Sequence, residues 1–361
     1  MEFGLSQEQH LLQKSVGGYL EKHGGLQRAR QFVDDGGPRA EDVWAGLCQL
    51  GVPGLLVDEE NGGLGLSLLD AALVAEVLGY YVTPVPFVST VVMAPLAIAA
   101  AGSAEQKLRW LPSLADGSVI AGAALTETIS SREGARISAA GPTLNGKALF
   151  VLDFEADVYL VADDACSLFL VNSKAPGLRR RQLSTIDKTR PVGELLFENV
   201  QAERLTGAAG REVCDHVVDA GRICLAADTL GAAQSMLDKA VAYSKVREQF
   251  GRVIGSFQAV KHMCAEMAAN LEPCRAMMWY AAHAFEAVPG ESRLTACHTK
   301  AHLSEVGTFV ARTATEVHGG IGFTDELGLH YWFKRIGADR QLLGGPDRVR
   351  LEAAKLQGLL N

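Results

Sequence analysis

The spacing of hydrophobic and polar positions divides the chain into three parts. Up to about Ser118, apolar residues recur every three or four positions in LSQEQHLLQKSVGGYLEKH and LLDAALVAEVLGYYV, as they do along one face of a helix. The segment between these stretches, GVPGLLVDEENGGLGLS, is rich in glycine and is predicted to be a loop. Residues 1–118 are therefore predicted to form an N-terminal α-helical domain.

A different pattern begins at Val119 and continues to about residue 206. Short runs of alternating or β-branched residues, ARISAA, KALFVLD, DVYLVAD and SLFLVN, predict strands. Asn145-Gly146 is typical of a hairpin turn, because the tight turn requires positive φ at both positions. The triplet from Arg179 to Arg181 is interpreted as a solvated strand or loop face rather than a binding patch. Residues 119–206 are predicted to form a middle β domain, a barrel or a sandwich.

Helical periodicity returns at about Gly207 and continues to the end of the chain. The order helix, strand, helix indicates an α+β fold, with a C-terminal helical bundle over residues 207–361. One long helix of this bundle shows its apolar face in the sequence. Residues predicted on that face are Val260, Met263, Cys264, Met267, Leu271 and Met278.

Composition narrows the classes of function. With 361 residues, 48% hydrophobic residues and a net charge of -8, the chain is typical of an acidic globular protein and has no basic excess for nucleic acid. The longest apolar stretch, VVMAPLAIAAA, is too short to span a bilayer, and the first residues do not resemble a secretory signal. Seven cysteines without a CxxC motif favour reduced thiols over disulfides or a zinc site. We expect a cytoplasmic protein that binds neither nucleic acid nor membrane.

One turn between two predicted helices carries candidate chemistry. In VREQFGRVIGSFQAVKHMCAEM, Gly251, Gly255 and a possible N-cap at Ser256 are sufficient for a simple helical hairpin. The same turn also gathers an arginine, two glutamines and a phenylalanine. A guanidinium can pair with a pyrophosphate, and an aromatic ring can lie along an adenosine. Both interpretations fit this segment taken alone.

The wider sequence resembles the acyl-CoA dehydrogenase family. The resemblance is carried by this turn together with GLSQEQ, DEENGGLGLSLLDAALVAEVLG, ALTE, LNGK followed by EAD, and EVHGGIGFTDE, in the family's order over nearly the whole chain. It implies a helical domain, a β domain and a C-terminal four-helix bundle. It further implies FAD at a subunit interface, with its ring held by one chain and its adenosine diphosphate half partly by the neighbour. In that family a glutamate removes the α proton of an acyl-CoA thioester while a hydride leaves the β carbon for the flavin.

This sequence has no glutamate at the position of that base. The family's base lies nine residues after an arginine, here Arg335, and the matching residue in QLLGGPDR is Gly344. Some members carry the base on an earlier helix, where the matching residue is Gly221, directly before Arg222. The resemblance therefore predicts no catalytic residue in this chain. Three nearby carboxylates could replace the base only from offset positions: Asp228, Asp339 and Asp347.

The side of the family's site that holds the flavin ring is also altered. Its TEPxAGSD motif reads TETISSRE here, from Thr126 to Glu133, and only Thr126 and Glu127 match. Leu152 replaces a threonine that hydrogen-bonds the isoalloxazine, and a leucine side chain has no hydroxyl to donate. The resemblance implies a cofactor contact for Thr126 alone on this side.

Residues that serve the neighbouring chain's cofactor are retained. The matches to the turn that contacts the adenosine diphosphate part of FAD are Arg247, Gln249, Phe250, Phe257 and Gln258, and the matches to a glycine pair that approaches it are Gly319 and Gly320. Glu316 departs from the family's frequent glutamine.

The C-terminal helices carry three further candidates: one pair of charged residues, a histidine and a tryptophan. Asp219 and Arg222 match a pair that helps hold acyl-CoA, although their spacing equally suits an intrahelical ion pair. His318 and Trp332 are interpreted as packed residues. No metal-ligand spacing is evident.

These residues favour a non-catalytic subunit of a heteromeric, α2β2 bacterial acyl-CoA dehydrogenase. Its expected partner is a catalytic subunit that shares FAD with it, and its expected substrate is an acyl-CoA, with bulky or steroid side-chain esters as the class such enzymes use. Electron-transfer flavoprotein is the acceptor implied by resemblance. Two alternatives stay open: a homo-oligomeric dehydrogenase with a displaced base, and a non-enzymatic acyl-CoA-binding scaffold without FAD.

Overall fold

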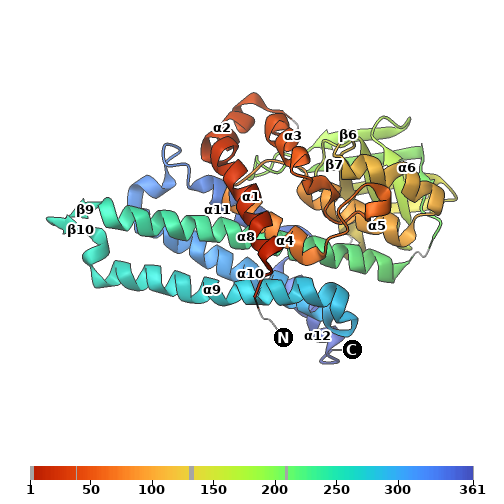
Figure 1. The fold of residues 1–361 in the computed structure, drawn as a ribbon. Helices are drawn as coiled ribbons and strands as arrows, with labels where there is room; N and C mark the ends of the chain where they lie inside the picture. Colours follow the sequence, from red (N-terminus) through yellow and green to blue (C-terminus); the bar gives the residue numbers. More distant parts are fainter. Residues whose placement is uncertain (1–3, 38, 130–133, 208–209, 361) are drawn as a thin grey trace.

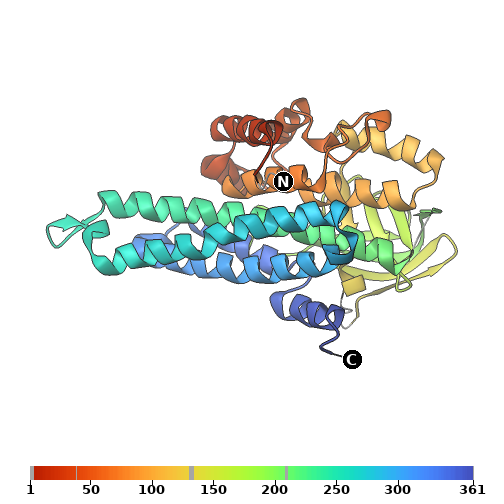
Figure 2. The same ribbon diagram turned by 60° about the horizontal axis from the view of Figure 1, so that its bottom comes forward.

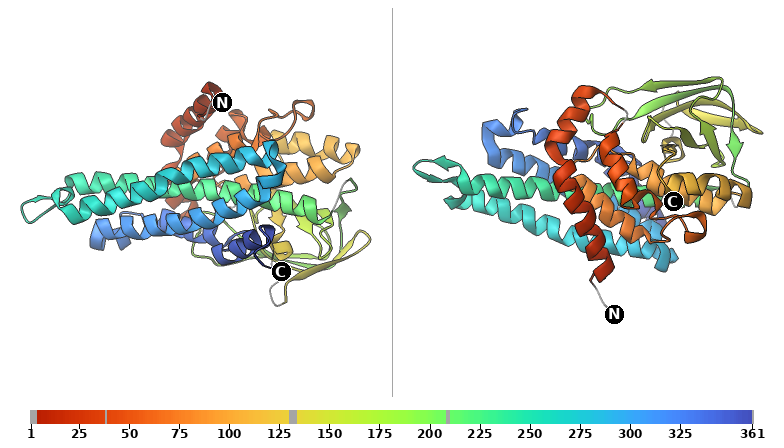
Figure 3. Two further views of the ribbon diagram at one scale, coloured as in Figure 1. Left: turned by 90° about the horizontal axis from the view of Figure 1, so that it is seen from below. Right: turned by 45° about the horizontal axis from the view of Figure 1, so that its top comes forward.

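The computed structural model describes residues 4–37, 39–129, 134–207 and 210–360. Helices occupy both ends of the chain and strands its middle, as predicted (Figure 1). The N-terminal helices lie across one face of the long C-terminal bundle, and the β domain sits at one end of it (Figure 3). The predicted domain boundaries at 118/119 and 206/207 stay predictions.

The N-terminal part packs around one almost entirely buried helix, α4 (Leu68–Tyr80). α4 crosses α8 (Arg211–Val246) with backbones in contact, because a Cβ at Gly231 would lie 1.8 Å from the Glu76 carbonyl oxygen. Ser6 starts the first helix with a capping box, its hydroxyl accepting from the Gln9 amide. The other elements of this part are α1 (Gln7–His23), α2 (Gly25–Asp35), α3 (Glu41–Gln49), η1 (Val52–Gly54), η2 (Glu59–Asn61), η3 (Val88–Met93), α5 (Ala94–Ala101) and α6 (Ala104–Ala115).

Two four-stranded sheets form the middle part. One has the order β1-β4-β5-β8 and the other β2-β3-β7-β6. Their strands are β1 (Ala121–Ala124), β2 (Arg136–Ala140), β3 (Thr143–Val151), β4 (Val158–Ala162), β5 (Leu168–Asn172), β6 (Leu178–Gln182), β7 (Gly193–Gln201) and β8 (Glu203–Arg204), with the short α7 (Thr126–Ile129) after β1. The arginine triplet lies on the exposed β6 and pairs with glutamates, which confirms its interpretation as a solvated face.

The predicted turn at Asn145-Gly146 is wrong. Both residues lie inside β3, and the hairpin turns at Gly141 and Pro142, between Ala140 and its partner Thr143. Gly146 is required for a different reason. Its φ is 124°, and a Cβ there would lie 1.9 Å from the Arg136 carbonyl oxygen on the neighbouring strand. The glycine thus marks a β-bulge with close backbone approach rather than a turn.

The C-terminal part is built on three long helices. α8, α9 (Gln258–Ala287) and α10 (Pro289–His318) run side by side, and the β9–β10 hairpin joins α8 to α9 at the protruding end of the bundle (Figure 1). The apolar face predicted for α9 is present, buried at Met267, Leu271 and Met278 and half-buried nearer the hairpin. The remaining elements are β9 (Glu248–Gln249), β10 (Arg252–Val253), η4 (Ile254–Ser256), η5 (Gly319–Phe323), α11 (His330–Gln341) and α12 (Pro346–Leu356).

Two general features of the sequence can be compared with the structure. All seven cysteines are free thiols, five of them buried. Within the described ranges, each helix is too short or too polar to cross a membrane.

Candidate functional site

The residues predicted to contact the adenosine diphosphate half of a cofactor gather at the protruding tip of the bundle. Arg247 directly follows α8, and Gly319 directly follows α10. The two helix ends are held together because Tyr243 stacks on His318 with ring centroids 4.7 Å apart. His318 is buried, and its Nδ1 donates to the Ala314 carbonyl at 2.7 Å, which confirms its interpretation as a packed residue.

The side chains at this tip are open to solvent. Arg247, Gln249 and Gln258 are exposed, and Phe250 is 93% exposed. Phe257 is half-buried and meets Phe250 edge-on at 6.2 Å. Phe250 also has a positive φ, which is uncommon for a residue other than glycine. Burial of its exposed ring in a complex would remove apolar surface from water and so would favour binding.

The glycine pair next to the hairpin is equally open. A Cβ added at Gly319 or Gly320 would find no heavy atom within 4 Å, so the backbone there is accessible to a ligand. Glu316 is exposed on the last turn of α10. Its negative charge opposes a pyrophosphate at this tip, whereas the Arg247 charge favours one.

The two predicted positions of the base converge beside the N-terminal third of α8, far from the tip. A Cβ on Gly221 would lie 2.6 Å from Leu343 Cδ1 and 3.0 Å from Met93 Sδ. A Cβ on Gly344 would lie 3.2 Å from Val349 and 3.5 Å from the Arg222 guanidinium. Both glycines therefore face one place that is filled by packed side chains.

An unusual turn explains the sequence QLLGGP. Leu343 has a φ of 54° and Gly344 a φ of 103°, so two consecutive residues adopt left-handed or extended positive-φ conformations between α11 and α12. The turn buries the Leu343 side chain against Gly221 and presents its carbonyl to Arg222 Nε at 2.9 Å. Pro346 then begins α12 at a position that needs no amide donor.

The predicted flavin-ring side lies at this closed end. Thr126 donates its hydroxyl to the Phe150 carbonyl at 3.5 Å. Leu152 is buried; its N–H donates to the Ala123 carbonyl and its carbonyl accepts from the Ala123 N–H, at 3.0 Å each. The residues from 130 to 133 of the TETISSRE stretch lie outside the described residues. Because Leu152 has no hydroxyl and its amide is already bonded, the residues described here do not fit a flavin ring.

Arg222 is the centre of a buried ion cluster. Its side chain is 1% exposed and donates to Asp219 Oδ1 at 3.0 Å and to both oxygens of Glu352 on α12, at 3.2 Å and 2.9 Å. Arg293 also binds Glu352, at 2.5 Å, and pairs with Asp215. The structure thus contains the predicted intrahelical pair of Asp219 and Arg222. Their proposed role in binding acyl-CoA stays a prediction.

Glu352 was not identified from the sequence. The available signal was its place beside Ala353 on the buried face of a short amphipathic helix, where a carboxylate needs a cation. Asp219, Cys297 and Glu352 offer ligand atoms within 4.8 Å of one another, which resembles a metal site. Arg222 Nη1 lies within 3.5 Å of all three, so a guanidinium already occupies the space between them.

The pKa values of Asp219 and Glu352 in this cluster are shifted in opposite directions. Burial raises the pKa of Asp219 to about 7, although the charges of Arg222 and Arg293 oppose the shift. Burial acts in the same sense on Glu352, but hydrogen bonds and charge from Arg222 and Arg293 outweigh it and lower the pKa. Glu352 is therefore a poor proton acceptor.

The three offset carboxylates are not placed to act as bases. Asp228 accepts from Arg190 at 2.9 Å and from Arg335 at 3.0 Å, and Asp339 pairs with Arg190. All four of these side chains are buried where the β domain meets α8 and α11. Burial raises the pKa of Asp339, whereas the two arginines overcome burial and lower the pKa of Asp228. Asp347 is exposed on the first turn of α12.

The two ends of α8 are far apart. Arg211, its first residue, donates to the Thr128 carbonyl at 2.8 Å and so ties α7 to the start of the helix. Arg247 follows its last residue after 36 positions, a length of about 54 Å at 1.5 Å per residue. Thr126 and Arg247 of one chain therefore cannot contact the same dinucleotide.

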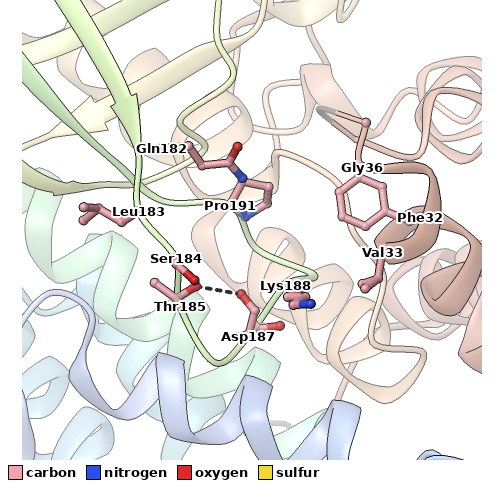
Figure 4. Close-up of a pocket in the computed structure, with 11 residues that line it drawn as sticks. Phe32, Val33, Gly36, Gln182, Leu183, Ser184, Thr185, Asp187, Lys188 and Pro191 are labelled. Atoms are coloured by element: carbon pink, nitrogen blue, oxygen red, sulfur yellow. Dashed lines mark hydrogen bonds between the residues drawn. The ribbon is translucent and has the colours of Figure 1, made fainter.

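Two cavities lie near the junction of the domains. One, about 260 Å³, is lined by Thr128 and Ile129 of α7, by Arg222 of α8 and by residues of α12 that include Glu352. Another, about 340 Å³, opens between the end of α2 and the segment from Gln182 to Pro191 (Figure 4). The residues predicted as cofactor or substrate contacts do not line this second cavity.

Trp332 lies on α11. It is buried, and its indole N–H donates to the Tyr80 carbonyl at 2.9 Å, joining α11 to α4. The Lys239 ammonium lies 4.6 Å from the ring centroid. Its interpretation as a packed residue is confirmed.

Comparison with known sequences and structures gives a consistent result. Residues 6–118 match the family described as Acyl-CoA dehydrogenase, N-terminal domain, and residues 208–355 match Acyl-CoA dehydrogenase, C-terminal domain. Acyl-CoA dehydrogenase IpdE2 of Mycobacterium tuberculosis is 31% identical over 350 residues, covering 96% of this chain and 97% of that protein.

Solved structures of heteromeric proteins are similar over the full length. A variant of the steroid ACAD Tcur3481-Tcur3483 superposes with a TM-score of 0.89 at 31% identity, covering 98% of each chain. The ChsE4-ChsE5 complex from Mycobacterium tuberculosis gives a TM-score of 0.91 at 25% identity, covering 100% of each chain.

Proposed function

Because the chain belongs to the acyl-CoA dehydrogenase family of FAD-dependent oxidoreductases, we propose that it is the non-catalytic subunit of a heteromeric member of that family. A catalytic partner subunit supplies the flavin-ring pocket and the glutamate, and this chain supplies its bundle tip. The two together dehydrogenate an acyl-CoA thioester between its α and β carbons.

One contrast carries the proposal. The tip of the bundle keeps an exposed arginine, exposed aromatic and amide side chains and an open glycine pair, whereas the position of the base is packed with Leu343, Met93 and Arg222. A chain with an active site of its own needs the second place open. A chain that only completes a neighbour's cofactor site needs only the first.

At the tip, Arg247 would pair with the pyrophosphate of FAD, and Phe250 would lie along its adenosine. The backbone at Gly319 and Gly320 would approach the same part of the cofactor. When bound, FAD supplies a hydride acceptor, and no residue described at the inner end of this chain is placed to use it.

The substrate and the acceptor are proposed from the relatives. One similar structure is named a steroid ACAD, which favours a bulky or steroid side-chain ester of coenzyme A for the complex. Electron-transfer flavoprotein is the proposed electron acceptor.

The proposal is tested by counting FAD. The chain is purified alone and together with a candidate catalytic acyl-CoA dehydrogenase subunit, and flavin absorbance is compared with protein concentration. We expect little FAD in the lone chain and about one FAD per heterodimer. Stoichiometric FAD in the lone chain with acyl-CoA turnover would instead support a homo-oligomer with a displaced base, and a complex without FAD would support a scaffold.

A further inference from the structure

A cleft of about 260 Å³ lies between α7, α8 and α12. Five basic side chains and two carboxylates line it, an excess of three positive charges: Arg211, Arg222, Arg293, Arg348 and Lys355, with Asp215 and Glu352. Such a cleft would attract a ligand that carries phosphate groups.

The two most enclosed cations of this cleft are already paired by one residue of the same chain. Glu352 accepts from Arg222 through both carboxylate oxygens, at 3.2 Å and 2.9 Å, and from Arg293 Nε at 3.1 Å. Arg222 is almost fully buried, and the Glu352 side chain is 19% exposed. This geometry, with two planar guanidinium groups around one carboxylate, is the arrangement that an external anion would need.

The same contacts hold α12 in place. Besides Glu352, α12 is held by a small apolar cluster of Val349 and Ala353 with α10, by the ion pair of Arg350 with Glu305, and by Arg348, which donates to the Ile129 carbonyl of α7 at 2.5 Å. α12 and α7 therefore lie together beside the turn that contains Gly344 (Figure 2).

We propose that Glu352 is an internal anion that occupies the Arg222 and Arg293 guanidinium groups of this cleft, so that this subunit does not take up a phosphate-bearing thioester of its own. The inference rests on the proposed function only for the ligand class, an acyl-CoA. The structural role of Glu352 does not depend on where FAD binds.

The wild-type complex gives the first test. A coenzyme A thioester is titrated into the holo complex by calorimetry, and the number bound is compared with the FAD content of the same sample. We expect one thioester per heterodimer. Two thioesters with one FAD would overturn the role of Glu352 and leave the proposed function intact, whereas two FAD per heterodimer would overturn the proposed function.

A second test removes the carboxylate charge that pairs with Arg222 and Arg293. Glu352→Gln removes the internal charge at nearly constant side-chain shape, and we expect the lone chain to gain at least tenfold in affinity for inorganic pyrophosphate, with binding weakened by salt. A folded Glu352→Gln chain without this gain would overturn the proposal. If that variant does not fold, the wild-type count decides alone.

A matched control is available at another ion pair between α10 and α12. Glu305 of α10 pairs with Arg350 of α12 at 2.5 Å, and both side chains are nearly half exposed on a face away from the cleft. Glu305→Gln makes the same change in net charge and breaks another contact between α12 and the bundle. We expect no gain in pyrophosphate binding, and an equal gain in both variants would mean that charge alone, and not the cleft, is responsible.

Discussion

The two ends of α8 differ in how their functional residues are used. At the hairpin end, Arg247 and Phe250 extend into solvent and Gly320 has open space around it. At the inner end, Gly221 and Arg222 are completely enclosed, by Leu343 and by carboxylates. The same helix therefore carries solvent-exposed binding groups at one end and buried, hydrogen-bonded groups toward the other.

The proposed cofactor-contacting tip and the place of the catalytic base can therefore be kept or lost separately. Arg222 precedes Arg247 by 25 residues, about 38 Å along α8 at 1.5 Å per residue, so the two places do not contact each other. Packing the inner end closed stabilises this chain and does not disturb the tip. Mutations at the two ends should consequently give opposite signatures, on folding at the inner end and on cofactor retention at the tip.

Among changes at the two ends, Gly221→Glu should lower the stability of the chain most. The new side chain would meet Leu343 at 2.6 Å and would bury a carboxylate whose neighbouring guanidinium is already saturated. We expect a loss of about 4 to 5 kcal/mol in the free energy of unfolding, measured by denaturant titration. Gly320→Glu places the same side chain in open space at the tip and should change stability by less than about 0.5 kcal/mol. Equal losses at both sites would show that the inner end is not closed.

A second effect is expected from pH, through Asp219. Its pKa in the folded chain is raised to about 7, so the folded state holds this proton more tightly than the unfolded state. The stability that this proton contributes is complete below the ordinary aspartate pKa and is lost as the pH rises through about 7. Asp219→Asn imitates the protonated form at every pH.

The variant should therefore gain on the wild type as the pH rises. We expect the difference in unfolding free energy to change by about 2 to 3 kcal/mol in favour of Asn between pH 5 and pH 8, followed by denaturant titration at each pH. Asp347→Asn makes the same substitution at an exposed position of α12. A difference for Asp219→Asn that stays constant across this range would contradict the raised pKa.

Most of the fold could be predicted from the sequence, because long amphipathic helices and β-branched strands leave clear periodicities. The helix containing Met267 and Met278 and the strand DVYLVAD are examples. The turn at Asn145-Gly146 could not, because the local signal for a hairpin is the same as that for a glycine in a bulge, and only the carbonyl of the neighbouring strand distinguishes them.

The site was predictable in part for a similar reason. The tip residues follow one another in a short motif, and both glycines at the base positions could be found by counting from Arg335 and Arg222. Glu352 could not, because its partners Arg222 and Arg293 are 130 and 59 residues distant in sequence and meet it only in the folded chain. Pairings of this kind depend on tertiary packing, which periodicity does not contain.

At the tip, Arg247→Glu should weaken retention of FAD by the complex about 10- to 100-fold, the range expected for a lost charge-assisted hydrogen bond. Folding of the lone chain should hardly change, because the side chain is exposed. Flavin content after gel filtration at rising salt measures the first effect, and thermal unfolding the second. Lys14→Glu on the exposed face of α1 makes the same charge change. Unchanged FAD retention in Arg247→Glu would remove this chain from the cofactor site.

The smallest effect on folding is expected from Phe250→Ala. The ring is 93% exposed and lies edge-on to Phe257, so its removal should alter the unfolding free energy of the lone chain by less than about 0.5 kcal/mol. Phe285 is a buried phenylalanine at the other end of the bundle, and changing it to Ala should lower the unfolding free energy by about 3 to 5 kcal/mol. If Phe250 is a contact to the partner's cofactor, its loss should still reduce the flavin content of the complex. A Phe250→Ala complex that retains FAD as firmly as the wild type would limit the cofactor contact at the tip to Arg247 and the glycine pair.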